Sequence, residues 1–156
     1  MESFVFNDMY VHLFLAMALG MTLGIERFIA RKTAGMRTYT LISMGSALFV
    51  IISQIVASRF DEQFFDPLRI AAQVVAAAGF LGVGAIVHRS DNNQVSGITT
   101  ASGMWVAAGI GMACGFGLYE LAVTVTVLGL FTFIVLWFIE KQIRKIPIKE
   151  KEDQPL

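Results

Sequence analysis

Residues 121–139 read LAVTVTVLGLFTFIVLWFI, nineteen consecutive positions without Lys, Arg, Asp or Glu. A helix of this length extends roughly 28 Å, close to the roughly 30 Å of the hydrocarbon core of a bilayer. Strands of a membrane barrel would alternate polar and apolar side chains, and this run does not. Because backbone groups find no water inside a bilayer, a run of this kind has to be helical. The stretch therefore predicts a transmembrane helix.

Four further runs of 17 to 19 residues also lack charged side chains, at 9–25, 39–57, 70–87 and 100–118. The whole chain is 56% apolar and 15% charged, whereas soluble domains are about 45–50% apolar and about 25% charged. This excess excludes a soluble enzyme domain, a disordered chain and a disulfide scaffold. We predict an all-α, polytopic bundle of five transmembrane helices over residues 1–139, followed by a short charged tail over residues 140–156.

The positive charges are distributed unevenly between the predicted loops. Ten Lys and Arg lie between the first and second spans, between the third and fourth, or after the fifth, and only Arg59 and Arg69 lie on the other side. The positive-inside rule then places the N-terminus outside and the charged tail in the cytoplasm. The leading segment has Glu2 and Asp8 but no basic residue, unlike a signal peptide, so we expect the first span to be retained. The zero net charge gives no indication of a nucleic-acid partner.

Small residues recur at four-residue spacing in the first and fourth spans. Such stripes let helix backbones approach closely, because lipid provides no hydrophobic drive and packing has to hold the helices together. We interpret them as the internal seam of the bundle, with a homodimer face as the alternative. The residues are Ala16, Gly20 and Gly24 in the first span and Gly103, Ala107, Gly111 and Gly115 in the fourth.

The third span is rich in small residues, with Gly79, Gly82 and Gly84 within six positions. A glycine inside a helix costs about 1 kcal/mol relative to alanine, so a cluster usually marks a close crossing or a local break. We expect close packing here. A partly unwound segment that holds a ligand is the alternative.

Charged and polar residues lie at the ends of the spans. Glu26 and Arg27 directly follow the first span, where Glu26 is either an interfacial charge or part of a functional site. Before the third span, Asp66 is expected to cap the helix and Arg69 to pair with it or extend toward the interface. Alternatively, these two residues form a polar pocket with Gln73, one helical turn deeper.

The loop before the fourth span is polar. Thr99 or Thr100 is expected to cap that span. Asp91, Asn92 and Asn93 are adjacent oxygen-bearing side chains, which far more often form a turn than bind a metal. We therefore predict no metal site there.

Catalytic residues are sparse along the whole chain. His12 is predicted in the outer half of the first span and His88 at the inner end of the third, so the two histidines are on opposite sides of the membrane. The single cysteine, Cys114, is expected to be a buried thiol. The sequence contains no Ser/His/Asp set, HExxH motif, P-loop or zinc-ligand spacing. These observations predict that the protein is not an enzyme and has no cofactor.

Five short strings in order resemble the membrane domain of the MgtC/SapB family. They are GMTLGIER (20–27), AGMRTYTLISMGSALF (34–49), DPLRIAAQVV (66–75), GFLGVGAI (79–86) and GITTA (97–101) followed by Trp105. The similarity runs from about residue 11 to 138. Carried over to this sequence, the charged and polar positions of the family motifs are Glu26, Arg27, Arg37, Asp66, Arg69, Gln73, Thr99 and Thr100.

This resemblance implies a bacterial inner-membrane protein associated with growth at low magnesium and, in pathogens, with survival inside macrophages. It implies a regulator that acts through other membrane proteins, including the rotary ATP synthase. The chain departs from the family in two ways. Longer members have a soluble C-terminal domain where this chain has its short tail, and Ala77-Ala78 replace a glycine and a β-branched residue.

We therefore expect a regulatory, partner-binding membrane protein. A transporter or channel for magnesium, another ion or a small solute is the alternative, because polar residues flank both ends of the predicted bundle. An enzyme that acts on lipid has the least support.

Overall fold

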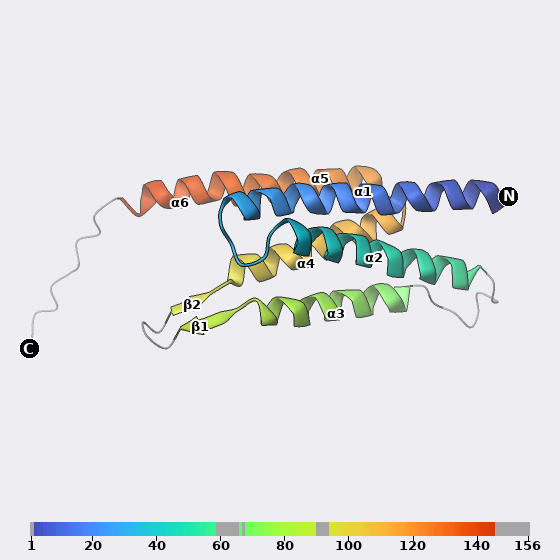
Figure 1. Ribbon diagram of the computed structural model, residues 1–156, viewed down its shortest axis with the longest axis horizontal. Coiled ribbons are helices and arrows are strands. Elements are labelled where there is room, and N and C mark those ends of the chain that lie inside the picture. The colour runs from blue at the N-terminus through green and yellow to red at the C-terminus, as the bar shows by residue number, and fades with distance from the viewer. Residues whose placement is uncertain (1, 59–65, 67, 90–93, 146–156) are drawn as a thin grey trace, which may run out of the picture.

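The computed structural model describes residues 2–58, 66, 68–89 and 94–145. Its helices run back and forth along one long axis, so that the first helix begins and the last helix ends at opposite ends of the bundle (Figure 1). The elements in chain order are α1 (Glu2–Ile29), α2 (Met36–Ala57), α3 (Leu68–Gly84), β1 (Val87–Arg89), β2 (Gln94–Ser96), α4 (Ile98–Gly115), α5 (Tyr119–Phe131), the π-helical turn η1 (Thr132–Leu136) and α6 (Trp137–Ile143).

The expected all-α membrane bundle is confirmed. Among the described residues, four helical segments are long and apolar enough to cross a bilayer, and α3 is apolar but has only 17 residues. The number of spans and their orientation stay predictions. The four long segments are Met9–Ile29, Met36–Ala57, Ile98–Gly115 and Tyr119–Ile143.

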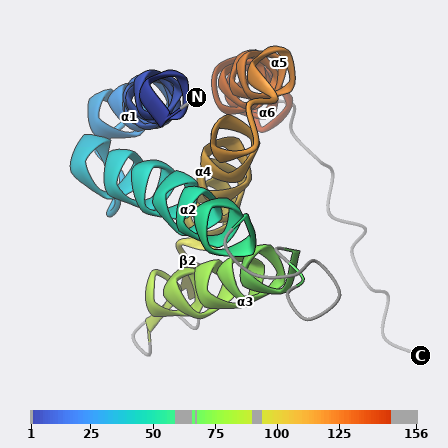
Figure 2. The same ribbon diagram turned by 90° about the vertical axis from the view of Figure 1, so that its right-hand side faces the viewer.

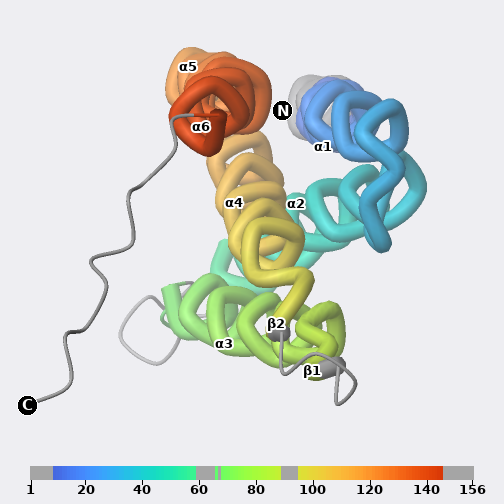
Figure 3. Tube along the Cα trace, turned by 90° about the vertical axis from the view of Figure 1, so that its left-hand side faces the viewer, coloured from blue at the N-terminus to red at the C-terminus, as the bar shows by residue number. Residues whose placement is uncertain are grey.

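Helix α4 lies at the centre of the bundle and contacts α1, α2, α3 and α5. Seen along the long axis, α1 lies beside α5 and α6, α3 lies on the far side of the bundle from them, and α2 lies between α1 and α3 (Figures 2 and 3). The buried core follows this order: Ala107, Ile110 and Cys114 of α4 pack with Ala16 and Leu23 of α1. Segments that are far apart in the sequence therefore meet along α4.

Most helix boundaries differ from the predicted spans by a few residues. Helix α1 continues through Glu26 and Arg27, and α6 continues to Ile143, because charged residues near an interface do not end a helix. Helix α3 ends at Gly84, and the predicted end of the third span instead forms β1, which pairs antiparallel with β2 through Val87 opposite Ser96. The predicted turn at residues 91–93 lies outside the described residues.

The start of α4 corrects a second expectation. The helix begins directly after Gly97, which has a φ of 96°, and no side chain caps it. A Cβ at Gly97 would collide with the Ala85 carbonyl oxygen, so this position requires glycine both for its left-handed backbone and for space. Thr99 and Thr100 lie inside the first turn of α4, and the prediction that either caps the helix is wrong.

Helix α2 packs between the two stripes of small residues. A Cβ at Gly20 or Gly24 of α1 would lie 2.6 Å from Ser43 Cβ or Met36 Cα, respectively. From α4, a Cβ at Gly115 would lie 2.8 Å from Val50 Cβ, and Cβ atoms at Gly111 and Gly103 would collide with the Ser43 carbonyl oxygen and the Tyr39 hydroxyl. Both stripes therefore form close contacts with the same helix.

The three glycines of α3 differ in how closely other helices approach them. A Cβ at Gly82 would lie 3.4 Å from Ala101 Cβ, whereas nothing lies within 4 Å of a Cβ at Gly79 or Gly84. The expectation of close packing is therefore wrong for Gly79 and Gly84, because α3 is at the edge of the bundle and contacts α2 and α4 with one face only. The helix is also continuous through this region, so it is not partly unwound.

Candidate functional site

A buried arginine joins α1 to α4 at the end of the bundle where the paired strands β1 and β2 lie. Arg27 is in the last two turns of α1, and its side chain is only 4% exposed. Its Nη2 donates a hydrogen bond of 3.1 Å to the Thr100 hydroxyl oxygen in the first turn of α4. A charge this deep in a membrane protein is costly and usually marks a functional position.

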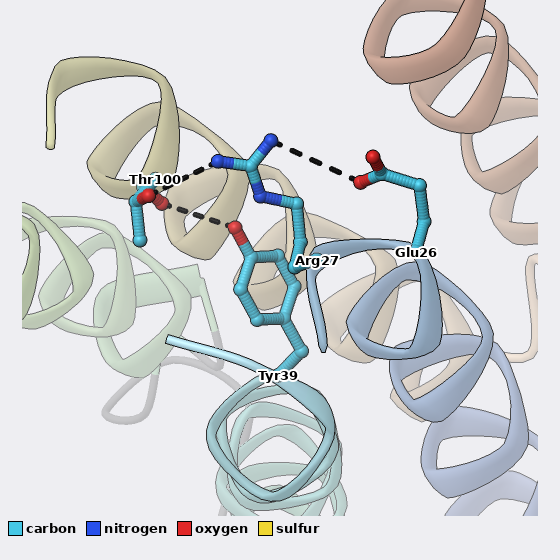
Figure 4. A network of polar contacts seen from close by, with 4 residues as sticks. All are labelled: Glu26, Arg27, Tyr39 and Thr100. Carbon is cyan, nitrogen blue, oxygen red and sulfur yellow. Dashed lines mark hydrogen bonds and ion pairs between the residues drawn. The ribbon is translucent and has the colours of Figure 1, made fainter. Parts of the chain in front are cut away.

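Tyr39 of α2 completes this network. Its side chain is fully buried, and its hydroxyl donates a hydrogen bond of 3.1 Å to the backbone carbonyl of Thr100 (Figure 4). Thr100 therefore accepts from Arg27 with its side chain and from Tyr39 with its backbone. The three residues connect α1, α2 and α4 at one point.

Glu26 approaches Arg27 without fully pairing with it. The Glu26 Oε2 atom lies 3.8 Å from Arg27 Nη1, which is beyond hydrogen-bond distance (Figure 4). Among the described residues, Glu26 Oε2 and Arg27 Nε are buried and have no hydrogen-bond partner. Buried polar atoms are nearly always paired, so two unpaired atoms in adjacent residues are typical of a site that a further group completes.

The fifth residue of the site is Phe133, in the π-helical turn η1. The Arg27 guanidinium carbon lies 4.6 Å from the centre of the Phe133 ring, which is a cation–π contact. Gly103 leaves room for this arrangement, because a Cβ there would lie 2.6 Å from Phe133 Cζ. Single π-helical turns inside α-helices occur often at functional sites.

A large cleft opens beside this network, between the end of α1 and the segment η1–α6. We call it the α1–α6 cleft; its volume is about 1250 Å³. It opens to the surroundings, since two of its lining residues, Ile29 and Trp137, are 74% and 54% exposed. Its basic lining residues are Arg27, Arg31, Lys32, Lys141 and Arg144, and its acidic ones are Glu26 and Glu140.

The structure brings together only part of the residues that the sequence singled out. Glu26, Arg27 and Thr100 converge, and Thr99 is exposed and lines the α1–α6 cleft. Arg37 is exposed and does not line the cleft.

Asp66, Arg69 and Gln73 are exposed at the other end of α3, away from this network. Asp66 accepts a hydrogen bond of 2.9 Å from the backbone N–H of Leu68, so it caps α3 as expected. Within the described part of the chain, Arg69 makes no ion pair with it. The proposed polar pocket with Gln73 does not form, because all three side chains face outward.

Two residues of the site were not predicted from the sequence. Tyr39 and Phe133 lie in apolar spans, where an aromatic residue is usually a core or lipid-facing side chain. The only available signal for Tyr39 was its place in the string 34–49. Nothing in the sequence singled out Phe133, because neither the π-helical turn nor the closeness of Arg27 can be read from an apolar run.

The role of Thr100 can be tested by removing its hydroxyl. We expect Thr100→Val to lower the free energy of unfolding by about 1–2 kcal/mol, because a buried guanidinium loses its acceptor. Thr100→Ser keeps the hydroxyl and is expected to cost less. The matched control is Thr124→Val, at an exposed position of α5. There we expect the free energy of unfolding to change by no more than about 0.5 kcal/mol. Thermal unfolding of the purified protein measures all three; equal effects at positions 100 and 124 would contradict the assignment.

Comparison with known proteins places the chain in a sequence family. Residues 13–142 match the MgtC family. A protein of Escherichia coli K12 named "Putative magnesium transporter YhiD" is 43% identical over 126 residues, which are 79% of this chain and 58% of that protein. No solved structure matches the chain.

Two further relatives cover more of this chain. Protein SapB of Bacillus subtilis is 35% identical over 142 residues, which are 89% of this chain and 60% of SapB. Protein MgtC of Salmonella typhimurium LT2 is 35% identical over 144 residues, which are 92% of this chain and 59% of MgtC. The chain thus spans about three fifths of the length of the curated relatives it matches.

Proposed function

The chain belongs to the MgtC family. From this premise we propose that it is a regulatory protein of the bacterial inner membrane, which binds partner proteins during adaptation to low magnesium. It is a multi-pass membrane protein. The partners we propose are other membrane proteins, of which the rotary ATP synthase is one candidate, or a second copy of this chain. We propose no catalytic activity.

One observation supports this proposal: the α1–α6 cleft is open to the surroundings, and the interior of the bundle next to it is tightly packed. Arg27 lines the α1–α6 cleft with a side chain that is only 4% exposed, is hydrogen-bonded to Thr100 and makes a cation–π contact with Phe133. Beyond it, the interior is filled by apolar side chains of α1 and α4, among them Leu23, Ile110 and Cys114, all at most 1% exposed. Ion and solute pathways are lined by polar groups or water. A cleft that ends in a packed core favours binding over transport.

Transport is the second candidate, because one relative carries the name of a magnesium transporter. A cleft that opens at one end is also what one state of an alternating-access transporter would have. Liposomes that contain the purified protein and a magnesium-sensitive dye distinguish the two. We expect no magnesium flux above that of empty liposomes, under a gradient of either direction. Saturable flux that Arg27→Lys abolishes would establish transport and overturn the regulatory proposal.

The regulatory role is tested by growth. We expect cells that lack the chromosomal copy to grow poorly at micromolar magnesium, and a plasmid copy of the natural chain to restore growth. Arg27→Lys is expected to fail, because lysine keeps the charge but not the planar guanidinium that bonds Thr100 and stacks on Phe133. Arg37→Lys is the matched control, since Arg37 is exposed and outside the cleft.

Membrane abundance of each variant, followed by immunoblot, separates loss of function from loss of protein. Equal growth of Arg27→Lys and Arg37→Lys at low magnesium would contradict a functional role of the buried arginine. Normal growth of the deletion strain at low magnesium would contradict the proposed role of the protein.

A further inference from the structure

The α1–α6 cleft has the charge of an anion site. Five basic and two acidic side chains line it. The basic residues come from two separate parts of the chain, Arg27, Arg31 and Lys32 at the end of α1 and Lys141 and Arg144 on or next to α6. Like charges from distant segments repel one another, so gathering them around one cleft is unfavourable unless an anion lies between them.

Arg27 provides a second and independent indication of a ligand. It lines the cleft with a side chain that is 4% exposed, and its Nε has no hydrogen-bond partner among the described residues. The carboxylate oxygen Oε2 of Glu26 lies 3.8 Å from a different nitrogen, Arg27 Nη1, which is beyond hydrogen-bond distance. A buried guanidinium with a free donor is the group that proteins use for phosphate, because its fork of N–H groups matches the phosphate oxygens.

The walls of the cleft show what kind of phosphate compound fits. Apolar and aromatic side chains line the cleft beside the charges, including Ile25, Ile29, Leu136 and Trp137. The volume of about 1250 Å³ is larger than the roughly 300–1,000 Å³ of an ordinary small-molecule pocket. Inorganic phosphate would occupy a small part of it and leave the apolar walls in water. A molecule with a charged end and long apolar chains would cover both kinds of wall.

The position of the cleft agrees with a lipid ligand. It lies at the end of the bundle that holds eight of the nine Lys and Arg in the described part of the chain, which the charge distribution along the sequence assigns to the cytoplasmic leaflet. Basic pockets between transmembrane helices on that side of a membrane bind the headgroups of anionic lipids. Trp137, with Lys141 Nζ at 5.0 Å from its ring centre, suits the interfacial region between headgroups and acyl chains.

We propose that the α1–α6 cleft binds an anionic phospholipid, with the phosphate among Arg27, Arg31, Lys32 and Arg144 and the acyl chains along the apolar walls. This deepens the proposed function, because it names the ligand of the cleft on which that proposal rests. A bound phosphate would provide an acceptor for Arg27 Nε, the donor of this side chain that has no partner among the described residues. It would also bridge the end of α1 and α6, next to the contact of Arg27 with Phe133 in η1.

The test uses the fluorescence of Trp137, which lines the cleft. The chain has two tryptophans, and Trp105→Phe leaves only Trp137, which lines the cleft. This protein is placed in phosphatidylcholine vesicles that contain increasing amounts of either dibrominated phosphatidylglycerol or dibrominated phosphatidylcholine, whose bromines quench a nearby tryptophan. We expect phosphatidylglycerol to show at least about a fivefold higher relative affinity, since one basic side chain at an anionic surface changes affinity about fivefold. Equal quenching by the two lipids would overturn the proposal.

Two adjacent residues provide a matched control. Arg144 lines the cleft, whereas its neighbour Lys145 does not, and both are exposed. Arg144→Gln is expected to reduce the preference for phosphatidylglycerol about fivefold, and Lys32→Gln with Arg144→Gln to abolish it. Lys145→Gln removes the same charge at the same end of the protein and is expected to keep the preference. Equal losses at positions 144 and 145 would show diffuse surface attraction and overturn the site.

A competition experiment distinguishes the two sources of phosphate. Inorganic phosphate at millimolar concentration is added to vesicles with bound dibrominated phosphatidylglycerol. We expect the quenching to remain; its reversal by phosphate would assign the site to a free anion and overturn the lipid proposal. The vesicle measurements do not depend on growth at low magnesium. Lipid selectivity with normal growth of the deletion strain would overturn only the proposed function, and impaired growth without lipid selectivity would overturn only this inference.

Discussion

Gly111→Ala is expected to lower the stability of the protein by about 3 kcal/mol or more, which is a drop of roughly 10 °C in the melting temperature for a chain of this size. A Cβ at this position would collide with the backbone carbonyl oxygen of Ser43 in α2. A side chain can rotate away from an added methyl group, but a backbone carbonyl inside a helix cannot. The new methyl group can therefore be accommodated only if α2 and α4 move apart.

Gly109→Ala is the matched control for this substitution. It lies two residues earlier on the same helix, and nothing lies within 4 Å of a Cβ there. Because alanine favours a helix over glycine by about 1 kcal/mol, we expect this variant to be as stable as the natural protein or slightly more stable.

A thiol-reactive fluorescent dye gives the melting temperature of both variants. Cys114 is the only cysteine in the sequence and is fully buried in the folded protein, so the dye reacts with it only on unfolding. If Gly111→Ala melts within about 2 °C of Gly109→Ala, the close approach of α2 and α4 is wrong.

The helical bundle could be predicted because the bilayer fixes the length and the apolar character of a spanning segment. The helix ends could not be predicted in the same way. Charged residues mark where a segment reaches the interface, and α1 simply continues through Glu26 and Arg27 to Ile29. Conversely, Ile86 and Val87 are as apolar as the span before them, yet they leave the helix for the hairpin. Apolar character does not distinguish a helix from the short strand that follows it.

The small-residue stripes show a similar limit. Four-residue spacing identifies one face of a helix, so Gly20 and Gly24 could be assigned to a packing face from sequence. The spacing does not say which helix lies against that face. The structure shows that the stripes of α1 and α4 both contact α2. In α3 the glycine content was misleading at Gly79 and Gly84, because a helix at the edge of the bundle has no neighbour on its outer face.

The candidate site was only partly predictable for a related reason. The sequence singles out Glu26, Arg27 and Thr100 as polar residues near span ends, but equally Asp66, Arg69 and Gln73. Only the packing of α1 against α4 decides which of them meet. Thr99 or Thr100 was expected to cap the helix, and Gly97 occupies the cap position of α4 instead. Because α4 begins at Ile98, Thr100 lies inside the helix, where its hydroxyl can accept from Arg27.

Arg27→Met is expected to be the most destabilising substitution in the site, with a loss of about 3 kcal/mol in the free energy of unfolding. Methionine keeps the apolar volume against Phe133 but removes the donor to Thr100 and the positive charge beside Glu26. The carboxylate would then be largely buried without a counter-charge. Losing one partner of a buried pair costs more than losing both, because the remaining charge has no compensation.

The double variant Glu26→Gln with Arg27→Met separates this effect from lost packing. Glu26→Gln alone is expected to cost less than about 1 kcal/mol, because Arg27 keeps Thr100 and Phe133 and the contact with Glu26 is long at 3.8 Å. Combined with Arg27→Met, it is expected to recover about 1 kcal/mol relative to Arg27→Met alone, since no charge then remains buried. Thermal unfolding of the four proteins gives the coupling energy directly. Strict additivity would show that Glu26 and Arg27 do not interact and that the stability of this end of the bundle depends on Thr100, Tyr39 and Phe133 alone.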